Sequence, residues 1–459
     1  MAAPVPDVVP DIARAVRDAG GRALVVGGWT RDRLLGLESK DLDVEVFGLP
    51  ADRLRALLER FGRVEAVGES FAVFKIGEID VSLPRRESKT GRGHKGFTVE
   101  GDPTLSVEDA ARRRDFTINA ISQDPLTGEW IDPFHGRADL ESRILRVVDP
   151  RTFPDDSLRV LRAVQLAARF ELTVDEDTNA LCRSIPLDDL PPERIWGEIE
   201  KLLLRAPRPS VGFAIALELG VVDRLWPELK ALVGCPQEPD WHPEGDVWVH
   251  TLMVIDEARR QIADLDRGRA VAVMLGAVCH DLGKPSTTAV IDGRIRSLGH
   301  EEAGVAPAAA VLDRLNVQSI GGFDVRGTVL GMVAHHLKPG SFVRPDARTG
   351  DGAFRRLALK VDLELLARVA RADCLGRTGG FDCSAMDRFV ARARALGVEH
   401  APPRPIVMGR HLLELGVEPG PRMGGILRQI YDRQLDGEIA TIEQGIDLAR
   451  QLISGPTRT

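Results

Sequence analysis

The chain is poor in cysteine and has no long apolar run. Its five cysteines are scattered over 459 residues, and no two of them have the Cys-x-x-Cys spacing of a zinc ribbon. This usage argues against a disulfide framework and favours a reducing, cytoplasmic location. No segment approaches the roughly 18 consecutive apolar residues that a membrane helix needs, and the N-terminus has neither the basic nor the apolar region of a secretory signal. We therefore expect no membrane partner.

An excess of basic residues is also absent. The 61 Lys and Arg are outnumbered by 69 Asp and Glu, which leaves a net charge of −8, whereas nucleic-acid-binding domains are usually basic. Basic residues do cluster at Arg85–Lys95 and Arg112–Arg114. Either cluster alone could be an ordinary solvated face. A mildly acidic protein with basic stripes nevertheless suits a nucleic acid that is bound and released in each cycle.

The order of apolar patterns predicts an α+β fold. Short strand and helix patterns alternate between 21 and 147, and from Asp155 onward the sequence is mainly helical. Glycines among basic residues between Pro84 and Leu105 predict a mobile loop. Proline-rich stretches suggest joints between domains near 186–209, 236–248 and 401–405. The expected strands are Ala23–Val26, Leu42–Phe47, Ala72–Ile76 and Ile79–Leu83.

The segment from Val25 to Glu45 predicts a site for phosphate and metal. Two glycines follow an apolar strand, so the backbone can turn and approach a ligand, and the next helix would direct its N-terminal amides at a phosphate. On the following strand Asp41, Asp43 and Glu45 share one face. Carboxylates at i, i+2 beside a phosphate are what a two-metal phosphoryl-transfer site needs. Glu45 and Asp80 are the alternatives for a third carboxylate.

This combination resembles the nucleotidyltransferases of the polymerase β superfamily, and in particular the class II branch that holds bacterial tRNA CCA-adding enzymes and poly(A) polymerases. The segment Arg113–Ala120 is also similar to the RRDFTINA motif of that branch. The resemblance implies a polymerase β-like head with a small mixed sheet, in which Asp41 and Asp43 are catalytic and hold Mg²⁺. It further implies nucleotide contacts from Gly28, Arg31, Arg114 and Asp115.

A third segment predicts base selection. Asp156, Arg159 and Arg162 follow one another at i+3 steps on one helical stripe, where an intrahelical salt bridge is the simple alternative. Cytosine and adenine both present an amino donor beside a ring-nitrogen acceptor, which Asp and Arg can read, whereas uracil and guanine present the reverse order. The segment resembles the EDxxR motif of the family, with Asp155 where Glu is usual. Gln165 stands where the family has a further arginine.

Six of the ten histidines fall between 242 and 336, which predicts a second site. The ordered set His250, His280, Asp281 and Asp373 resembles the HD phosphohydrolase superfamily. This resemblance implies one divalent transition metal on these four residues, with Ni²⁺, Mn²⁺ or Co²⁺ as candidates. A second metal would use His300 with His335 or His336. For CCA-adding enzymes that carry this domain, it implies 2′,3′-cyclic phosphodiesterase, 2′-nucleotidase and phosphatase activities.

Three further segments resemble parts of the family. The loop Lys89–Phe97 is similar to one found in members that add the terminal A. Pro192–Glu198 resembles an ERxxxE motif that braces the neck, with an expected Arg194–Glu198 pair. Residues 409–438 resemble segments that touch the tRNA body. The expected domains are a head at 21–147, an all-α base-selecting neck at 148–235, an all-α HD domain at 240–385 and a helical tRNA-binding tail at 400–453.

Together these resemblances imply an enzyme that adds or repairs the 3′-terminal CCA of tRNA without a template. Its partners would be tRNA, CTP and ATP, pyrophosphate would be released, and the chain would act as a monomer or homodimer. Two alternatives remain open. One is a poly(A) polymerase or A-adding enzyme of the same family. The other is a metal phosphohydrolase whose head only binds RNA.

Overall fold

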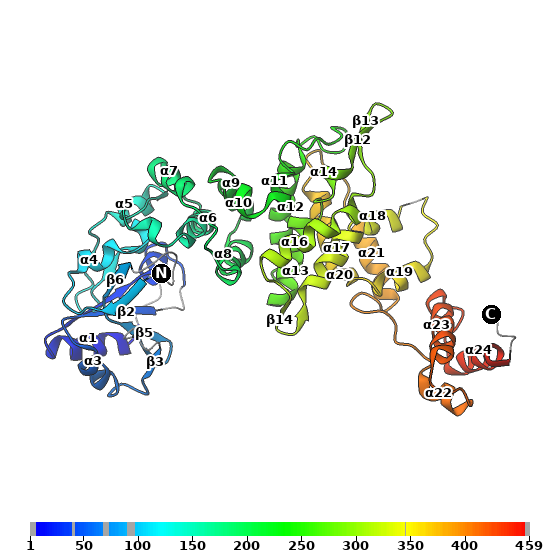
Figure 1. The fold of residues 1–459 in the computed structure, drawn as a ribbon, viewed down its shortest axis with the longest axis horizontal. Coiled ribbons are helices and arrows are strands. Elements are labelled where there is room, and N and C mark those ends of the chain that lie inside the picture. The colour runs from blue at the N-terminus through cyan, green and yellow to red at the C-terminus, as the bar shows by residue number, and fades with distance from the viewer. Residues whose placement is uncertain (1–5, 39–41, 68–72, 90–96, 345, 455–459) are drawn as a thin grey trace. The chain divides into compact units, whose positions relative to one another are not determined.

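The computed structural model in Figure 1 describes residues 6–38, 42–67, 73–89, 97–344 and 346–454. The chain forms two compact units. The first comprises Met1–Ala206 and Val211–Leu225, and the second comprises Pro207–Ser210 and Trp226–Thr459. No helix in the described ranges has the length and apolarity to cross a membrane.

A seven-stranded mixed sheet organises the first part of the first unit. Its strand order is β3-β4-β5-β2-β1-β8-β9, and only β2 and β5 among these neighbours run parallel. The strands are β1 (Arg22–Val26), β2 (Leu42–Phe47), β3 (Glu65–Val67), β4 (Val73–Ile76), β5 (Ile79–Ser82), β8 (Ser122–Gln123) and β9 (Trp130–Ile131). The helices here are α1 (Val8–Asp18), α2 (Gly28–Leu34), α3 (Ala51–Leu58) and α4 (Val107–Arg112).

The alternation of side chains along β2 explains where its carboxylates lie. Val44 and Val46 belong to the apolar cluster that α1 and α3 form with one face of the sheet, the side on which Figure 1 shows both helices. Successive strand residues point to opposite faces, so Asp43 and Glu45 lie on the other face. Because the apolar residues of β2 face α1 and α3, its acidic residues lie on the opposite face of the sheet.

The segment expected to be a mobile loop is a β-hairpin in its described part. Strands β6 (Arg85–Lys89) and β7 (Phe97–Gly101) pair antiparallel, and Arg86 donates two hydrogen bonds to Asp102, of 3.0 and 2.7 Å. The expectation missed the ladder because this segment lacks apolar alternation. The centre of the predicted loop, residues 90–96, lies outside the described residues.

The rest of the first unit is mainly helical. Helix α6 packs along α8, and two short 3-10 turns, Thr117–Asn119 and Phe153–Asp155, precede it in the chain. The helices are α5 (Gly136–Glu141), α6 (Leu158–Phe170), α7 (Glu176–Ser184), α8 (Pro192–Arg205), α9 (Pro209–Glu218) and α10 (Val221–Leu225), and a small parallel ladder joins β10 (Ile144–Leu145) to β11 (Thr173–Val174).

The second unit is built around α13 (Arg267–Cys279), whose residues from Ala270 onward are apolar or small and all buried. Helices α12, α17 and α20 pack against it. The chain also forms α11 (Pro227–Lys230), α12 (Val247–Arg260), α14 (Lys284–Thr287), α15 (His300–Ala303), α16 (Val305–Arg314), α17 (Val325–His335), α18 (Lys338–Phe342), α19 (Asp351–Ala358), α20 (Leu363–Leu375) and α21 (Ser384–Ala395). Helices α22 (Gly409–Glu414), α23 (Pro421–Asp436) and α24 (Ile442–Ser454) share a separate apolar cluster.

Two expectations for this unit need correction. The HD segment is not all helical, because it contains the hairpins β12 (Thr288–Ile291) with β13 (Arg294–Ser297) and β14 (Ser319–Ile320) with β15 (Phe323–Asp324). The sequence also argued against disulfides, but Cys374 and Cys383 form one. The loop after α20 folds back on its own helix end, which places two cysteines side by side that sequence spacing does not relate.

Candidate active sites

The glycine turn brings backbone against charged side chains. Gly27 has φ +79° and precedes α2, directly after β1. A Cβ atom at Gly27 would lie 3.1 Å from Asp43 Oδ2 and 3.3 Å from Arg114 Nη1. A side chain would therefore both strain the backbone and crowd the site. The turn, the carboxylate and the arginine come from three separate segments of the sequence.

The acidic residues of the sheet line a cavity of about 310 Å³. Asp43 of β2 pairs in register with Asp80 of β5, and Glu45 Oε2 lies 3.8 Å from Arg114 Nη2. Asp80 is 3.7 Å from Lys75 Nζ on the neighbouring strand. The second predicted catalytic residue, Asp41, lies outside the described residues. The structure thus places one member of the catalytic pair, together with both alternatives for a third carboxylate.

A neighbouring cavity of about 380 Å³ gathers the predicted nucleotide-binding residues. The family resemblance implied that segments 27–31, 113–119 and 156–162 share a nucleotide, and the structure places all three around one space. The lining includes Asp43 together with Gly28, Arg31, Arg114, Asp115, Asp156, Arg159 and Arg162.

Arg31 is held inside the protein. Its side chain donates to Asp32 Oδ1 and, from Nη1, to Asn119 Oδ1 at 2.6 Å, and its Cζ lies 4.2 Å from the centre of the Phe170 ring. Burial lowers the pKa of Arg31, against the charge of Asp32. The predicted phosphate ligand therefore also joins the glycine turn to Asn119.

Asp115 is a buried carboxylate with both oxygens engaged. Oδ2 accepts from Arg162 Nε at 2.6 Å, and Oδ1 accepts from Asn119 Nδ2 and the Phe116 N–H. Burial alone would raise the pKa of Asp115, but the charge of Arg162 and these hydrogen bonds lower it to about 2. The pairing of Asp115 with Arg162 was not predicted, although both residues were.

Asp156 does not pair with Arg159. It lies in extended backbone before α6, and both of its oxygens accept from Arg194 of α8, at 3.0 and 2.9 Å. Arg159 donates to the carbonyls of Thr152 and Arg113. The intrahelical salt bridge is therefore absent, and so is the common helical stripe.

The ERxxxE segment also differs from expectation. The expected Arg194–Glu198 pair does not form. Arg194 donates to Asp156 instead, and Glu198 accepts a hydrogen bond of 2.8 Å from Lys201. Gln165 is buried, and its Nε2 has no hydrogen-bond partner. Sequence reasoning missed the role of Arg194. The ERxxxE resemblance pointed to Arg194 as a bracing residue, but it assigned Glu198 and not Asp156 as its partner.

Four buried imidazoles face one another in the second unit. In each ring, Nδ1 lies 2.7–2.9 Å from an acceptor: Glu244 Oε1 for His250, and the carbonyls of Ala277, Ser297 and Val333 for His280, His300 and His336. A carbonyl can only accept, so Nδ1 carries the proton in the latter three rings and Nε2 presents a lone pair. His300 Nε2 and His336 Nε2 are 3.2 Å apart. Two lone pairs at that distance fit a shared cation.

The carboxylates complete this cluster. Asp281 lies 3.2 Å from His280 Nε2 and 3.4 Å from His300 Nε2, and Asp373 lies 3.1 Å from His250 Nε2. Burial would raise the pKa of Asp281, but the positive charge of Lys284, 2.7 Å away, helps to hold it well below its ordinary value. Burial lowers the pKa of His336 to about 3, so this ring is neutral at pH 7. Neutral imidazoles and ionised carboxylates are the forms that bind a divalent metal.

The structure separates His335 from His336. Only His336 joins Asp281 and His300 in a group with metal-ligand spacing, and it lines the same cavity of about 320 Å³. His335 is the preceding residue and is not part of this group. Of the two alternatives for the second metal, the geometry therefore favours His336. Sequence reasoning also missed Glu244, which lies within 2.9 Å of both His242 and His250.

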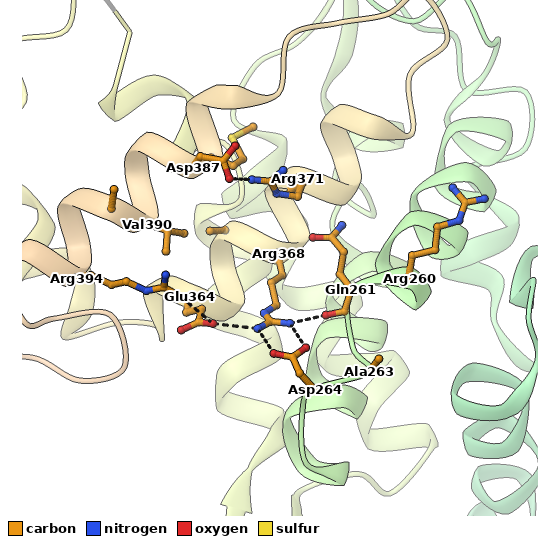
Figure 2. Close-up of a pocket in the computed structure, with 13 residues that line it drawn as sticks. Arg260, Gln261, Ala263, Asp264, Glu364, Arg368, Arg371, Asp387, Val390 and Arg394 are labelled. Carbon is orange, nitrogen blue, oxygen red and sulfur yellow. Dashed lines mark hydrogen bonds and ion pairs between the residues drawn. The ribbon is translucent and has the colours of Figure 1, made fainter.

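A further cavity in this unit, of about 540 Å³, carries paired charges (Figure 2). Arg368 donates to both oxygens of Asp264 at 2.7 Å, and Figure 2 shows Arg371 directed at Asp387. Arg394 lies 3.5 Å from Glu364. Each of these arginines faces a carboxylate, so the charges around this cavity are balanced locally.

Comparison with known proteins places the chain in a family. Residues 23–146 match the family described as "Poly A polymerase head domain", and residues 171–232 match "Probable RNA and SrmB- binding site of polymerase A". A "Multifunctional CCA protein" from Methylobacillus flagellatus is 38% identical over 387 residues, which cover 80% of this chain and 87% of the relative. The chain belongs to the multifunctional CCA protein family. A member from Laribacter hongkongensis is also 38% identical, over 78% of this chain and 86% of its own.

Solved structures share the fold of this multifunctional CCA protein family member. The Bacillus stearothermophilus CCA-adding enzyme in complex with CTP aligns with a TM-score of 0.65 and 22% identity, over 96% of each chain. The Thermotoga maritima CCA-adding enzyme complexed with tRNA aligns with a TM-score of 0.58 and 19% identity, over 98% of this chain and 96% of that one. The expected N-terminal sheet with helices and helical remainder are thereby confirmed.

Proposed function

We propose that the cavity of the first unit adds or repairs the 3′-terminal CCA of tRNA, using CTP and ATP and releasing pyrophosphate in the cytoplasm. One observation carries this proposal: a single cavity is lined by Asp43, by the arginine and aspartate of the RRDFTINA segment, and by the residues of the EDxxR segment. A nucleotide there would meet groups suited to its phosphates, its ribose and its base. Relatives named for CCA activity support the same conclusion.

Asp156 and Arg159 are the base-reading residues in this proposal. A carboxylate has about four acceptor positions and a guanidinium has five N–H groups, so the bonds to Arg194 and to two carbonyls leave others for a base. Asp156 would accept from the amino group of cytosine or adenine, and Arg159 would donate to the ring nitrogen. Uracil and guanine would leave both groups unpaired, which opposes their binding.

Asp43 would hold Mg²⁺ together with Asp41, and Gly28 and Arg114 would contact the triphosphate. Magnesium ions at such a site neutralise the charge of the triphosphate and of the leaving pyrophosphate. Asp115, ionised at neutral pH, would accept a hydrogen bond from a ribose hydroxyl. The helical tail, with Arg410, Arg422 and Arg428 on its surface, would contact tRNA phosphates.

The second unit is proposed to be an HD-type phosphohydrolase. Its Nε2 atoms and carboxylates fit a divalent transition metal, with Ni²⁺, Mn²⁺ and Co²⁺ as candidates, because borderline metals accept imidazole and carboxylate together. A metal held there supplies a Lewis acid for phosphoester hydrolysis. Lys284 and Arg377, beside Asp281 and Asp373, would hold the phosphate charge.

One incubation tests the transferase proposal. Pure protein with Mg²⁺ is given tRNA transcripts that end before CCA, after C or after CC, with CTP and ATP singly and together. Addition of three nucleotides followed by a stop supports CCA synthesis. Addition of A only after CC would indicate an A-adding enzyme, and long tails from ATP alone would indicate a poly(A) polymerase. If no nucleotide is incorporated, the transferase proposal fails and the second unit becomes the candidate for the activity of the protein.

A further inference from the structure

An exposed tryptophan stands at the mouth of the histidine–aspartate cavity. Trp241 is 54% exposed and lines the same cavity as Asp281, His300 and His336. Its ring lies 6.4 Å from the ring of Phe381, at an angle of 23°. Large aromatic side chains are usually buried when nothing else needs them. One face of this pair is therefore available to a flat ligand.

The loop that carries Phe381 is fixed against the loop that carries Trp241. The Thr378 N–H, three residues before Phe381, donates to Glu244 Oε2 at 3.3 Å, and Glu244 lies three residues after Trp241. On the other side, the Ile295 N–H of β13 donates to Glu238 at 2.9 Å. The aromatic pair is thus held in place relative to the metal-ligating residues.

Charge and size narrow the class of ligand. Lys284 and Arg377 line the inner part of the cavity beside the aspartates, where a phosphate would lie, and Arg344 lines it as well. The volume of about 320 Å³ is at the small end for ligand sites, enough for one mononucleotide. A phosphate-binding floor with an aromatic rim matches a nucleoside phosphate better than a phosphate alone.

We propose that Trp241, supported by Phe381, is a stacking platform for the base of a terminal ribonucleotide whose phosphate is hydrolysed at the histidine–aspartate cluster. This proposal rests on the phosphohydrolase function of the second unit. Stacking uses the π-face that every base has, so the platform binds purines and pyrimidines alike. The substrate class is then a nucleoside phosphate or a phosphorylated RNA end, not an inorganic or protein phosphate.

The first test compares substrates with and without a base. With Mn²⁺, the variant Trp241→Ala is expected to raise KM about tenfold for adenosine and cytidine 2′,3′-cyclic phosphates, the loss that one base–aromatic stack predicts. Its kcat, and its KM for methyl riboside 2,3-cyclic phosphate, stay as in the wild type. Trp241→Phe retains most of the affinity. Val290→Ala, at a 73% exposed apolar position on β12, is the control and behaves as the wild type. An equal change of KM in Trp241→Ala for substrates with and without a base would overturn the proposal that Trp241 stacks on the base.

A second measurement separates the platform from the hydrolysis. Adenosine 3′-monophosphate is expected to quench the intrinsic fluorescence of the wild type more than that of Trp241→Ala, because the difference isolates Trp241 from the other five tryptophans. If the wild type hydrolyses none of the substrates, the phosphohydrolase proposal fails, and the quenching difference alone then decides the platform. Identical quenching in the two proteins would overturn it.

Discussion

Arg194 of α8 donates two hydrogen bonds, of 3.0 and 2.9 Å, to the two carboxylate oxygens of Asp156 at the start of α6. The two residues are 38 positions apart. A bidentate Arg–carboxylate pair fixes the direction of the carboxylate as well as its charge. The orientation of the proposed base-reading residue thus depends on a helix that lies further along the chain.

Removing Arg194 should therefore loosen base selection. Arg194→Ala is expected to lower kcat/KM for CTP and ATP by about tenfold to a hundredfold, the range for a misplaced recognition group, and to raise UTP incorporation. Arg194→Lys should recover only part of the lost kcat/KM, since an ammonium group cannot make the two parallel hydrogen bonds of a guanidinium. The measurement is single-nucleotide incorporation into tRNA. Arg205→Ala, exposed on the same helix, is the control, and a similar loss there would contradict the positioning role.

Asp115 should make stability depend on pH in acid. Its pKa is about 2 in the folded protein and 3.8 ordinarily, so its contribution is fully present above pH 5 and is lost as the pH falls toward 2. At pH 7 Asp115→Asn is expected to cost about 2 kcal/mol, and by pH 3 the difference should fall to about half. Urea unfolding of both proteins at several pH values measures this. A difference that stays constant from pH 7 to pH 3 would rule out the linkage.

The two proposed activities should separate by mutation. Asp43→Ala is expected to abolish nucleotide transfer and to leave hydrolysis of 2′,3′-cyclic phosphates unchanged, because its carboxylate lies in the first unit. His280→Ala should do the reverse. Both assays are run on each folded variant. Loss of both activities in either variant would refute the assignment of two independent sites.

Glu244 should matter for metal binding although it is not a proposed ligand. It lies 2.8 Å from His250 Nδ1, and partners of this kind orient a ligating imidazole and raise its basicity. Glu244→Gln is expected to lower metal affinity or hydrolysis by about tenfold to a hundredfold. Metal content after dialysis and the rate against metal concentration are the readouts. Glu257→Gln, on the same helix as His250, should bind metal as the wild type does; an equal loss in both would point to general damage.

Local sequence patterns were sufficient for much of the fold. The strands Leu42–Phe47 and Ile79–Leu83 were predicted within a residue or so, because period-two burial is written in the chain itself. The pairing of β6 with β7 was missed because the sequence between Pro84 and Leu105 shows no apolar alternation. The disulfide of Cys374 was missed because it depends on how a loop folds back after α20.

The sequence by itself determined which residue types stand in the site: the glycine turn, the acidic strand, the RRDFTINA and EDxxR segments and the ordered histidines and aspartates. Only the tertiary structure decided their partners. Asp115 with Arg162 and Asp156 with Arg194 join segments far apart in the chain, which no local periodicity encodes. His335 and His336 differ by about 100° around the helix axis, so packing alone selects the one that faces His300. Chemistry is carried by the residues, and their pairing is set by long-range contacts.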